Sequence, residues 1–560
     1  MLSIVTLPLV FLCACVILSA NLNILDSMSN AEKPHDSNTS QAVVLSESAA
    51  GLRLYDTATH EVSAFTSIKP GKVGMYVCGA TVQSSPHIGH IRAAVAFDVV
   101  RRWLMRLGYD VTFIRNVTDI DDKILNKAAD AGQQWWARAY HYEREFTQAY
   151  DVLGVLPPTY EPRATGHIGD MVTLIERILK RGHGYVVRDE HGKLTGNVYF
   201  DVPSWPQYGE LTHQKQTVIA DEDAAIADQM GPSVDNAGND KYNPVDAADA
   251  SPDKHDPRDF ALWKASKETD PATATWDTPF GKGRPGWHLE CSTMSHRYLE
   301  GMFDIHGGGL DLRFPHHENE MAQTKAAGYD SAARWMHSAW VTAKGEKMSK
   351  SLGNGLSVPA VLASNSAWVV RYALGSVHYR SMLEWSDQAL DEARAAFDRI
   401  SGFIERATAV AGEQPSSDAI AAIAADQLPA DFVTAMNDDI NVSGAIAAIF
   451  TAIRNGNTLL AQADADRETV RTALIQVRAM LDTLGLDPEA SPWNQADSSN
   501  ETAEAEHQVL DTLIRQQLDA RAQARKDKDY AKADAIRDSL QDSGIAITDG
   551  PDGSTWSISR

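Results

Sequence analysis

Residues 73–117 read VGMYVCGATVQSSPHIGHIRAAVAFDVVRRWLMRLGYDVTFIRNV. Residues 73–78 form a short apolar run with the length of a buried strand. A turn carries His87-Ile88-Gly89-His90, residues 91–107 then have the apolar spacing of a helix, and residues 111–117 form a second strand-like run. This order predicts a β–α–β unit, which is one half of a doubly wound, nucleotide-binding sheet.

The rest of the 560-residue chain is too long to share one core with this unit. Residues 140–215 hold helical and short strand-like runs, which we place as an insertion between the two halves of the sheet. Residues 220–256 contain ten Asp or Glu and two Lys without an apolar period, so we expect a solvated loop there. Residues 389–410 and 433–484 have amphipathic patterns typical of a helical bundle.

The predicted fold class is therefore α/β: a Rossmann-like doubly wound domain with an insertion, followed by an α-helical bundle and a small C-terminal α+β domain. The expected ranges are an N-terminal extension at 1–50, the α/β domain at 51–358 with its insertion at about 140–258, the bundle at 359–485, a linker at 486–504 and the terminal domain at 505–560.

The N-terminus differs from the rest of the chain. Residues 2–20 are almost wholly apolar, long enough to resemble a membrane span or a signal sequence. The first basic residue is Lys33, so the positive segment of a signal sequence is missing. We favour a start assigned too far upstream, with Met28 as the true start; a genuine membrane anchor is the alternative.

The formal net charge of −24 does not exclude a nucleic-acid partner, because a local basic face is enough to bind phosphates. Beyond the N-terminal stretch the chain has two cysteines, Cys78 and Cys291. They could form a disulfide, but the nearby segment Pro315-His316-His317-Glu318-Asn319-Glu320 favours a metal pair.

The spacing of this segment puts a nitrogen and an oxygen ligand on one helical face. His316 and Glu320 are four residues apart after Pro315, and His317 with Glu320, three apart, would serve as well. Two sulfurs, one nitrogen and one oxygen suit zinc. A structural zinc and a zinc that binds substrate both fit these residues.

Two further motifs indicate chemistry on a nucleoside triphosphate. Around His87-Ile88-Gly89-His90 the free N–H groups of a helix start suit phosphates, Gly89 permits close approach, and His87 and His90 can donate to phosphate oxygens. In Lys347-Met348-Ser349-Lys350-Ser351 two lysines on a glycine-bounded loop can close over ATP and neutralise the transition state. Taken singly, the first is also a helix-capping turn and the second a solvated basic loop.

Together these motifs resemble the cysteinyl-tRNA synthetases, a family of class I aminoacyl-tRNA synthetases, over residues 51–560 apart from the acidic loop. The resemblance selects Cys78, Cys291, His316 and Glu320 as zinc ligands and implies that zinc accepts the thiolate of L-cysteine, which serine cannot match. It implies ATP with Mg²⁺, formation of cysteinyl-adenylate, transfer to tRNA(Cys), a monomer in the cytoplasm and no membrane partner.

Other residues take expected roles from the same resemblance. Trp287 would wall the amino-acid pocket, Thr118 would contact the substrate, and Asp311 would bind ribose or ammonium, although core packing and helix capping also explain Trp287 and the acids after Thr118. The terminal domain would bind the anticodon. The family pattern there matches Arg525, Asp534 and Asp549, with Tyr530 where a Trp is common.

Two other classes of function compete with this one. A related ligase would pass the same adenylate to an amino sugar, but it would lack a full anticodon domain. A non-catalytic RNA- or metal-binding protein on this fold would have no need of Lys350. If it were such a protein, Lys350→Ala would leave its activity unchanged.

Overall fold

The computed structural model describes residues 44–213, 251–343, 346–347, 356–494, 514–527, 529–542, 545–550 and 553–558. The apolar stretch 2–20, Met28, most of the acidic loop 220–256 and Lys350 lie outside these residues. Within them, no helix combines the length and the apolar character that crossing a bilayer requires.

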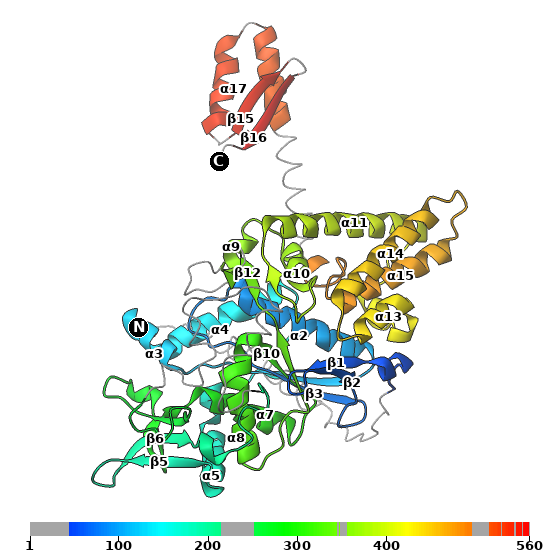
Figure 1. Cartoon of the computed structure of the whole chain (residues 1–560). Coiled ribbons are helices and arrows are strands. Elements are labelled where there is room, and N and C mark those ends of the chain that lie inside the picture. The colour runs from blue at the N-terminus through cyan, green and yellow to red at the C-terminus, as the bar shows by residue number, and fades with distance from the viewer. Residues whose placement is uncertain are drawn as a thin grey trace, which may run out of the picture. The chain divides into compact units, whose positions relative to one another are not determined.

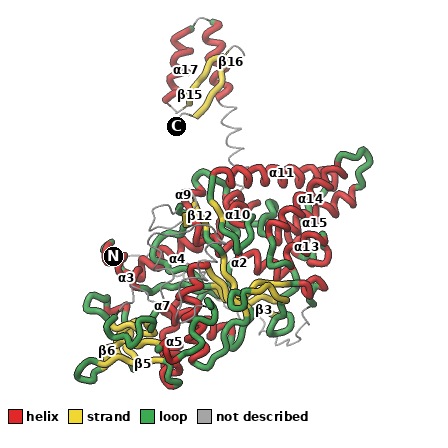
Figure 2. Tube along the Cα trace, in the orientation of Figure 1, coloured by secondary structure: helices red, strands yellow, loops and turns green. Residues whose placement is uncertain are grey.

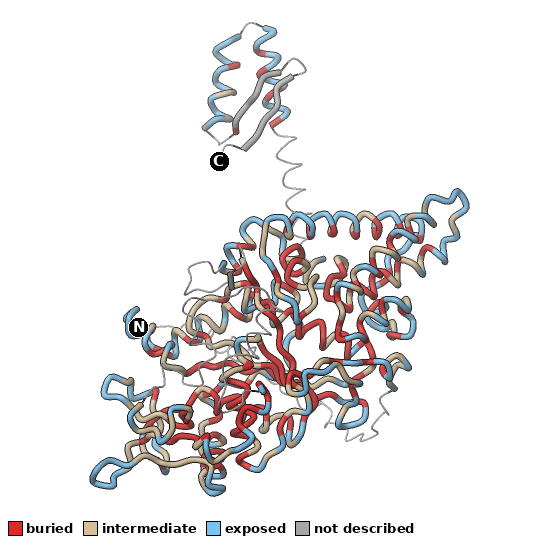
Figure 3. The backbone as a smooth tube through the Cα atoms, in the orientation of Figure 1, coloured by how far each residue is buried: buried red, intermediate tan, exposed pale blue. Residues whose placement is uncertain are grey.

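A four-stranded parallel sheet forms the centre of the α/β part, and its strands are among the most buried segments (Figures 1 and 3). The strand order is β11 (Arg334–Ser338), β10 (Ile305–Gly309), β3 (Lys72–Val77), β4 (Asp110–Arg115). The chain moves outward from β3 to β4 and, in the second half, outward from β10 to β11. The doubly wound sheet is thus confirmed, and its topological switch point, where such sheets bind ligands, lies between the carboxyl ends of β3 and β10.

Helix α2 (Ile88–Arg106) connects β3 to β4 and starts earlier than the sequence pattern predicts. His87 is its N-cap, with extended backbone at φ −117° and ψ 163°, so Ile88, Gly89 and His90 form the first turn instead of a preceding loop. The buried face of the helix includes Ile88, Ile91 and Val95, at spacings of three and four residues. The histidine motif therefore stands at the N-terminus of a helix beside the switch point.

The insertion between β4 and β10 contains a separate antiparallel sheet, as expected from the short strand-like runs. Its order is β5 (Gly184–Arg188), β6 (Leu194–Phe200), β7 (Phe260–Ala265), β9 (Gly281–Pro285), β8 (Trp276–Thr278). Near the N-terminus of the described chain, β1 (Arg53–Asp56) pairs with β2 (Glu61–Ala64). The helices of this part are α3 (Asp122–Asp130), α4 (Trp135–Val152), α5 (Ile168–Lys180), α7 (Trp287–Leu299) and α8 (Glu318–Ala326).

A small sheet follows the central one, with β12 (Val341–Ala343) between β13 (Glu346–Lys347) and β14 (Leu383–Glu384). From there to residue 494 most of the described chain is helical (Figure 2). The helices are α9 (Val358–Leu362), α10 (Ala367–Gly375), α11 (Asp387–Ala411), α12 (Ser417–Ala421), α13 (Ala430–Asn437), α14 (Val442–Leu460) and α15 (Arg467–Thr483).

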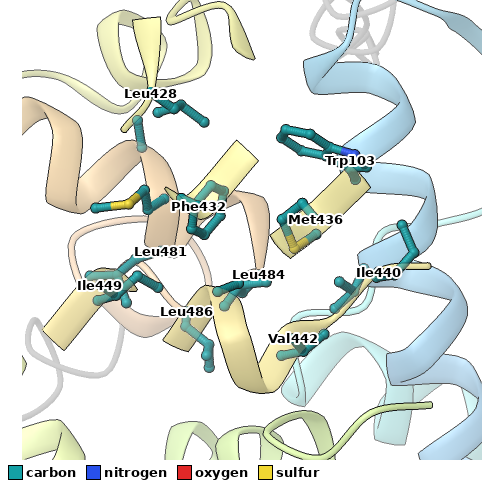
Figure 4. Packing of buried hydrophobic residues seen from close by; sticks show 14 of the residues in the cluster. Trp103, Leu428, Phe432, Met436, Ile440, Val442, Ile449, Leu481, Leu484 and Leu486 are labelled. Carbon is teal, nitrogen blue, oxygen red and sulfur yellow. The ribbon is translucent and has the colours of Figure 1, made fainter. Parts of the chain in front are cut away.

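The helical region shares its core with the back of α2. Trp103 of α2 lies edge-on to Phe432 of α13, with ring centroids 6.1 Å apart, and its indole nitrogen donates to Asn437 at 3.1 Å (Figure 4). The apolar run 433–484 is interrupted where Asn441 caps α14 and Asp466 caps α15. The region is therefore a bundle of several helices, as predicted.

The C-terminal unit has its own small core. It consists of a helical segment at 514–526, α17 (Tyr530–Asp542), and an antiparallel hairpin of β15 (Ile545–Gly550) and β16 (Gly553–Ile558). Ile514, Leu518 and Ile545 pack together in it. This agrees with the predicted α+β terminal domain.

Candidate metal centre and active site

The four predicted zinc ligands come together although they lie far apart in the sequence. Cys78 follows β3, Cys291 is in α7, His316 is in the π-helical turn Arg313–His317, and Glu320 is in α8. One ligand atom from each lies within 4.8 Å of those of the other three. The Cys78 thiol donates to Glu320 Oε1 at 3.4 Å, and His316 Nε2 is 3.0 Å from the same oxygen. Among the described cysteines both are free thiols, so the disulfide alternative is wrong.

Charge is divided unequally over this cluster. Burial raises the pKa of Cys78 well above its ordinary value, and the Cys291 sulfur beside it raises it further. Burial also raises the pKa of Cys291, but the hydrogen bond from Cys78 and the contact with His316 bring it down to about 7. Burial lowers the pKa of His316, yet Glu320 and Cys291 raise it to about 10. Binding a cation here would release the His316 proton.

A second group of donors overlaps the first. His306, His317, Cys78 and Glu320 also lie within 4.8 Å of one another. His317 Nε2 is 3.3 Å and His306 Nε2 3.4 Å from the Cys78 sulfur. Spacing alone could not choose between His316 and His317, and both approach the cluster. The His316 group is the one that contains both cysteines.

The donor set fits zinc by an observation independent of spacing. Glu320 is buried, and its Oε2 accepts no hydrogen bond from any described residue. His306 Nε2 lies 3.4 Å from this oxygen, but burial lowers the pKa of His306 to about 4, so its imidazole brings no charge at neutral pH. A buried carboxylate oxygen without a donor is costly unless a cation binds it. Two sulfurs, an imidazole and this carboxylate match the ligand chemistry of zinc.

Two glycines allow the backbone to approach closely enough to build the cluster. A Cβ on Gly79, next to Cys78, would lie 1.7 Å from the carbonyl oxygen of Asn116. A Cβ on Gly308 of β10 would lie 2.8 Å from the His317 ring. Any larger residue at these positions would push the ligand-bearing segments apart.

Thr118 and Trp287, predicted to contact substrate, both border the cluster. The Thr118 hydroxyl donates to the buried carboxylate of Glu290 at 2.7 Å. The half-buried Trp287 ring stacks on His316, with centroids 4.3 Å apart. Trp287 therefore packs on a candidate ligand while keeping an exposed part that can wall a pocket.

The acids after Thr118 are largely structural. Asp121 caps α3 by accepting from the backbone N–H of Lys123 at 2.8 Å, and Asp122 pairs with Arg284, which is buried. The helix-capping interpretation therefore holds for Asp121 alone, since Asp122 forms an ion pair and Asp119 accepts from the backbone N–H of Thr165 at 2.9 Å. Asp311 differs: it is exposed on the turn after β10, at the carboxyl edge of the central sheet.

The lysine segment is tied to the histidine motif through the backbone. Lys347 pairs with Thr342 of β12, and on the other side of the loop Ser357 bridges to His87. The N–H of Ile88 donates to the carbonyl of Leu356 at 3.1 Å. The His87 and His90 rings stack at 3.6 Å between centroids. The end of the loop at Leu356 and Ser357 is thus anchored beside the first turn of α2, and Lys347 at its other end is anchored to β12. Lys350 lies outside the described residues.

In the C-terminal unit Arg525, Tyr530 and Asp534 are exposed on helical segments, and Tyr530 is 62% exposed. Asp534 Oδ1 lies 3.3 Å from Arg537 Nη1, in an ion pair one helical turn along. Asp549 belongs to β15, where the backbone is described.

Several residues of the site escaped sequence reasoning. His288 and Glu290 lie between Trp287 and Cys291 in the motif, and a residue between two recognised ones carries no separate signal. Asn116 accepts from the N–H of Gly79 at 2.8 Å and lies 3.6 Å from the Cys291 sulfur. His337 lies 2.8 Å from His317 Nδ1, and only the register of β10 with β11 brings it there.

Three family profiles match successive parts of the chain. The family of tRNA synthetases class I (C) catalytic domain matches residues 64–395, the DALR domain matches 431–487, and the cysteinyl-tRNA ligase anticodon binding domain matches 508–556. A solved structure of Mycobacterium tuberculosis methionyl-tRNA synthetase in complex with methionyl-adenylate is similar in fold, with TM-score 0.50 and 17% identity, over 74% of this chain and 89% of that one.

Curated relatives are much more similar in sequence. The cysteine–tRNA ligase of Bifidobacterium longum is 73% identical over 545 residues, covering 95% of this chain and 100% of the relative. The cysteine–tRNA ligase of Beutenbergia cavernae is 52% identical over 508 residues, covering 90% of this chain and 99% of the relative. With these relatives and with the class I catalytic profile over most of the α/β part, the chain belongs to the cysteine–tRNA ligase family of class I tRNA synthetases.

Proposed function

We propose that the protein activates L-cysteine with ATP to cysteinyl-adenylate and pyrophosphate, and then transfers the cysteinyl group to tRNA(Cys) with release of AMP. The observation that carries this proposal is the four-donor cluster beside the switch point of the sheet, with the histidine motif at the start of α2 next to the same point. This arrangement supports an amino-acid selector and an ATP site at the edge where doubly wound sheets bind ligands.

Cys78, Cys291, His316 and Glu320 would hold one zinc ion. When bound, zinc supplies a position for a substrate thiolate that a serine hydroxyl fills poorly, so cysteine is selected without editing. Asn116 and Gly79 hold the Cys78 segment against the end of β4, and Thr118 holds Glu290 beside Cys291. Trp287 and Thr118 border the space for the amino acid.

The remaining residues act on ATP by position and charge. His87, Gly89 and His90 would bind the triphosphate at the start of α2, where the positive end of the helix dipole favours an anion. Lys347 and Lys350 would neutralise the charge that develops as pyrophosphate leaves, with Mg²⁺ accompanying ATP. Asp311 would bind the ribose or the substrate ammonium at the carboxyl end of β10.

Arg525, Tyr530, Asp534 and Asp549 would recognise the anticodon. Exposed cationic and aromatic side chains suit phosphates and unstacked bases. We further propose a monomer in the cytoplasm, where ATP and tRNA are available, without a membrane partner. The profile match at 508–556 argues against the amino-sugar ligase, which would need no anticodon domain.

The test is cysteine-dependent exchange of labelled pyrophosphate into ATP, together with charging of total tRNA with labelled cysteine. Both activities are expected with cysteine and neither with serine. Lys350→Ala should lower the exchange rate by about 10²- to 10³-fold, as for loss of one transition-state contact. Exchange without charging would favour the amino-sugar ligase, and indifference to Lys350→Ala would favour a non-catalytic binder.

A further inference from the structure

Helix α4 carries an unusual outer face. Trp136 is 54% exposed and Tyr140 is 57% exposed, and Arg144 is also exposed. The three residues are spaced four apart, so they lie in one row along the helix. Exposed large aromatic side chains gathered on one face mark interaction surfaces more often than single ones do.

The opposite face of α4 is fixed to the segment that contains the histidine motif. The ring of Phe146 lies 5.4 Å from the ring of His90. Arg138 Nε donates at 3.1 Å to the carbonyl of Gln83, which precedes the motif. Since α4 lies beside α2 (Figure 1), its outer face at the level of Phe146 is about one helix diameter, roughly 10 Å, from the first turn of α2, and Trp136 lies about 15 Å further along α4.

The charges around this face favour an anionic partner. Glu143 is engaged by Arg163 at 2.7 Å, and Glu145 by His141 at 2.9 Å. Arg144 forms no ion pair with another described residue. The row therefore offers two aromatic rings and a cation in a chain whose net charge is −24.

We propose that Trp136, Tyr140 and Arg144 bind the single-stranded 3′ end of the tRNA substrate and guide its terminal adenosine toward the adenylate. This inference rests on the proposed function, because that function requires an RNA end to reach the histidine motif. Unpaired bases stack on aromatic rings, and phosphates bind arginine. A second copy of the chain on this face would cover the approach to the site, which argues against a dimer contact.

The test compares two double variants of the full-length protein. Trp136→Ala with Tyr140→Ala removes both rings, and Trp136→Phe with Tyr140→Phe keeps them as a matched control. The alanine pair should lower kcat/KM for tRNA by about 5- to 150-fold, the range expected for loss of stacking on one base. Cysteine-dependent pyrophosphate exchange should stay within twofold, and the phenylalanine pair should charge tRNA almost as well as the wild type.

Arg144→Gln adds a second readout, since it should weaken tRNA binding and reduce its dependence on salt. Unchanged charging by the alanine pair would overturn the proposal. So would a parallel loss of exchange, which would make the rings part of the site wall, or a wild-type dimer that the alanine pair dissociates without loss of charging. Absence of cysteine-dependent pyrophosphate exchange in the wild type would reject the proposed function. In that case the affinity of the wild type and the alanine pair for tRNA, measured by filter binding, would still test the outer face of α4.

Discussion

At the scale of single residues, the two body cysteines share a cluster but differ in protonation. Cys78 keeps its proton because burial raises its pKa, whereas the pKa of Cys291 is lowered to about 7 by the hydrogen bond from Cys78 and by His316, against the effect of burial. The lowered pKa favours the thiolate of Cys291, which is the form that binds a metal. This residue is therefore the sharpest probe of the metal proposal.

Changing Cys291→Ser should abolish stoichiometric zinc and raise KM for cysteine at least tenfold, because an uncharged hydroxyl is a far poorer zinc ligand than a thiolate. KM for ATP should change less than threefold. Metal content is measured by atomic absorption and both constants by pyrophosphate exchange. Equal losses for the two substrates would indicate a purely structural zinc.

Thr118 offers a second test at this scale, because its hydroxyl donates to the buried Glu290. Thr118→Val leaves that carboxyl without its donor and should lower the free energy of unfolding by about 1–3 kcal/mol. Thr118→Ser keeps the hydroxyl and should behave like the wild type. Urea unfolding and KM for cysteine are measured together. A raised KM at unchanged stability would show that the hydroxyl contacts substrate instead.

At the scale of secondary-structure elements, α2 joins the active site to the helical bundle. Its buried Asp98 pairs with Arg102 at 2.8 Å and with Arg371 of α10 at 2.5 Å. Burial raises the pKa of Asp98, but the two arginines lower it more, to about 2. The motif at one end of α2 is thus held in place by an ion cluster in its middle.

Asp98→Asn should lower the free energy of unfolding by about 3–5 kcal/mol near neutral pH, because two buried guanidinium groups lose their carboxylate. The folded pKa lies below the unfolded value of about 3.9, so the contribution is present above pH 4 and is lost as pH falls toward 2. The stability gap between wild type and variant should narrow over that window in urea titrations.

The control for this prediction is Asp110→Asn. Asp110 forms an exposed pair with Lys72 at 3.7 Å, with both side chains about 60% exposed. Such pairs contribute less than about 1 kcal/mol. The assignment of Asp98 to a buried ion cluster would be contradicted if Asp98→Asn lowered the free energy of unfolding no more than Asp110→Asn does, or if its effect did not change with pH.

At the scale of the whole molecule, the catalytic and terminal parts have separate cores. The two large clusters draw their members from residues 49–486, and the small cluster of Ile514, Leu518 and Ile545 is distinct from them. Removing the terminal unit should therefore leave the catalytic core intact.

A chain that ends at residue 494 should retain cysteine-dependent pyrophosphate exchange within threefold and lose at least 100-fold in kcat/KM for charging of tRNA(Cys). The reason is that anticodon contacts are lost while the adenylation site is kept. Full-length protein assayed in parallel is the control. If the shortened chain charged tRNA(Cys) as well as the full-length protein, the terminal unit would not be the part that recognises the anticodon.

The sequence by itself determined the main elements and the types of donor side chain at the candidate site, because both are encoded locally. The short apolar runs at 73–78 and 111–117 lie on either side of a helical pattern, and run length together with apolar period predicts strands and a helix there. The residue types of the cysteine, histidine and glutamate segments likewise suit zinc before any contact is known. Helix α2 begins at Ile88, three residues before the predicted start at residue 91, because its cap His87 is a polar residue and gives no periodic signal.

Only the tertiary structure decided which groups meet. Parallel register places β10 between β3 and β11, and it brings His306 to the Cys78 sulfur and His337 to His317. The hydrogen bond from Thr118 to Glu290 joins residues 172 positions apart in the sequence. The packing of Phe146 on His90 decides which face of α4 is buried and therefore which face is exposed. Such contacts depend on distances across the fold, and a one-dimensional pattern carries no record of those distances.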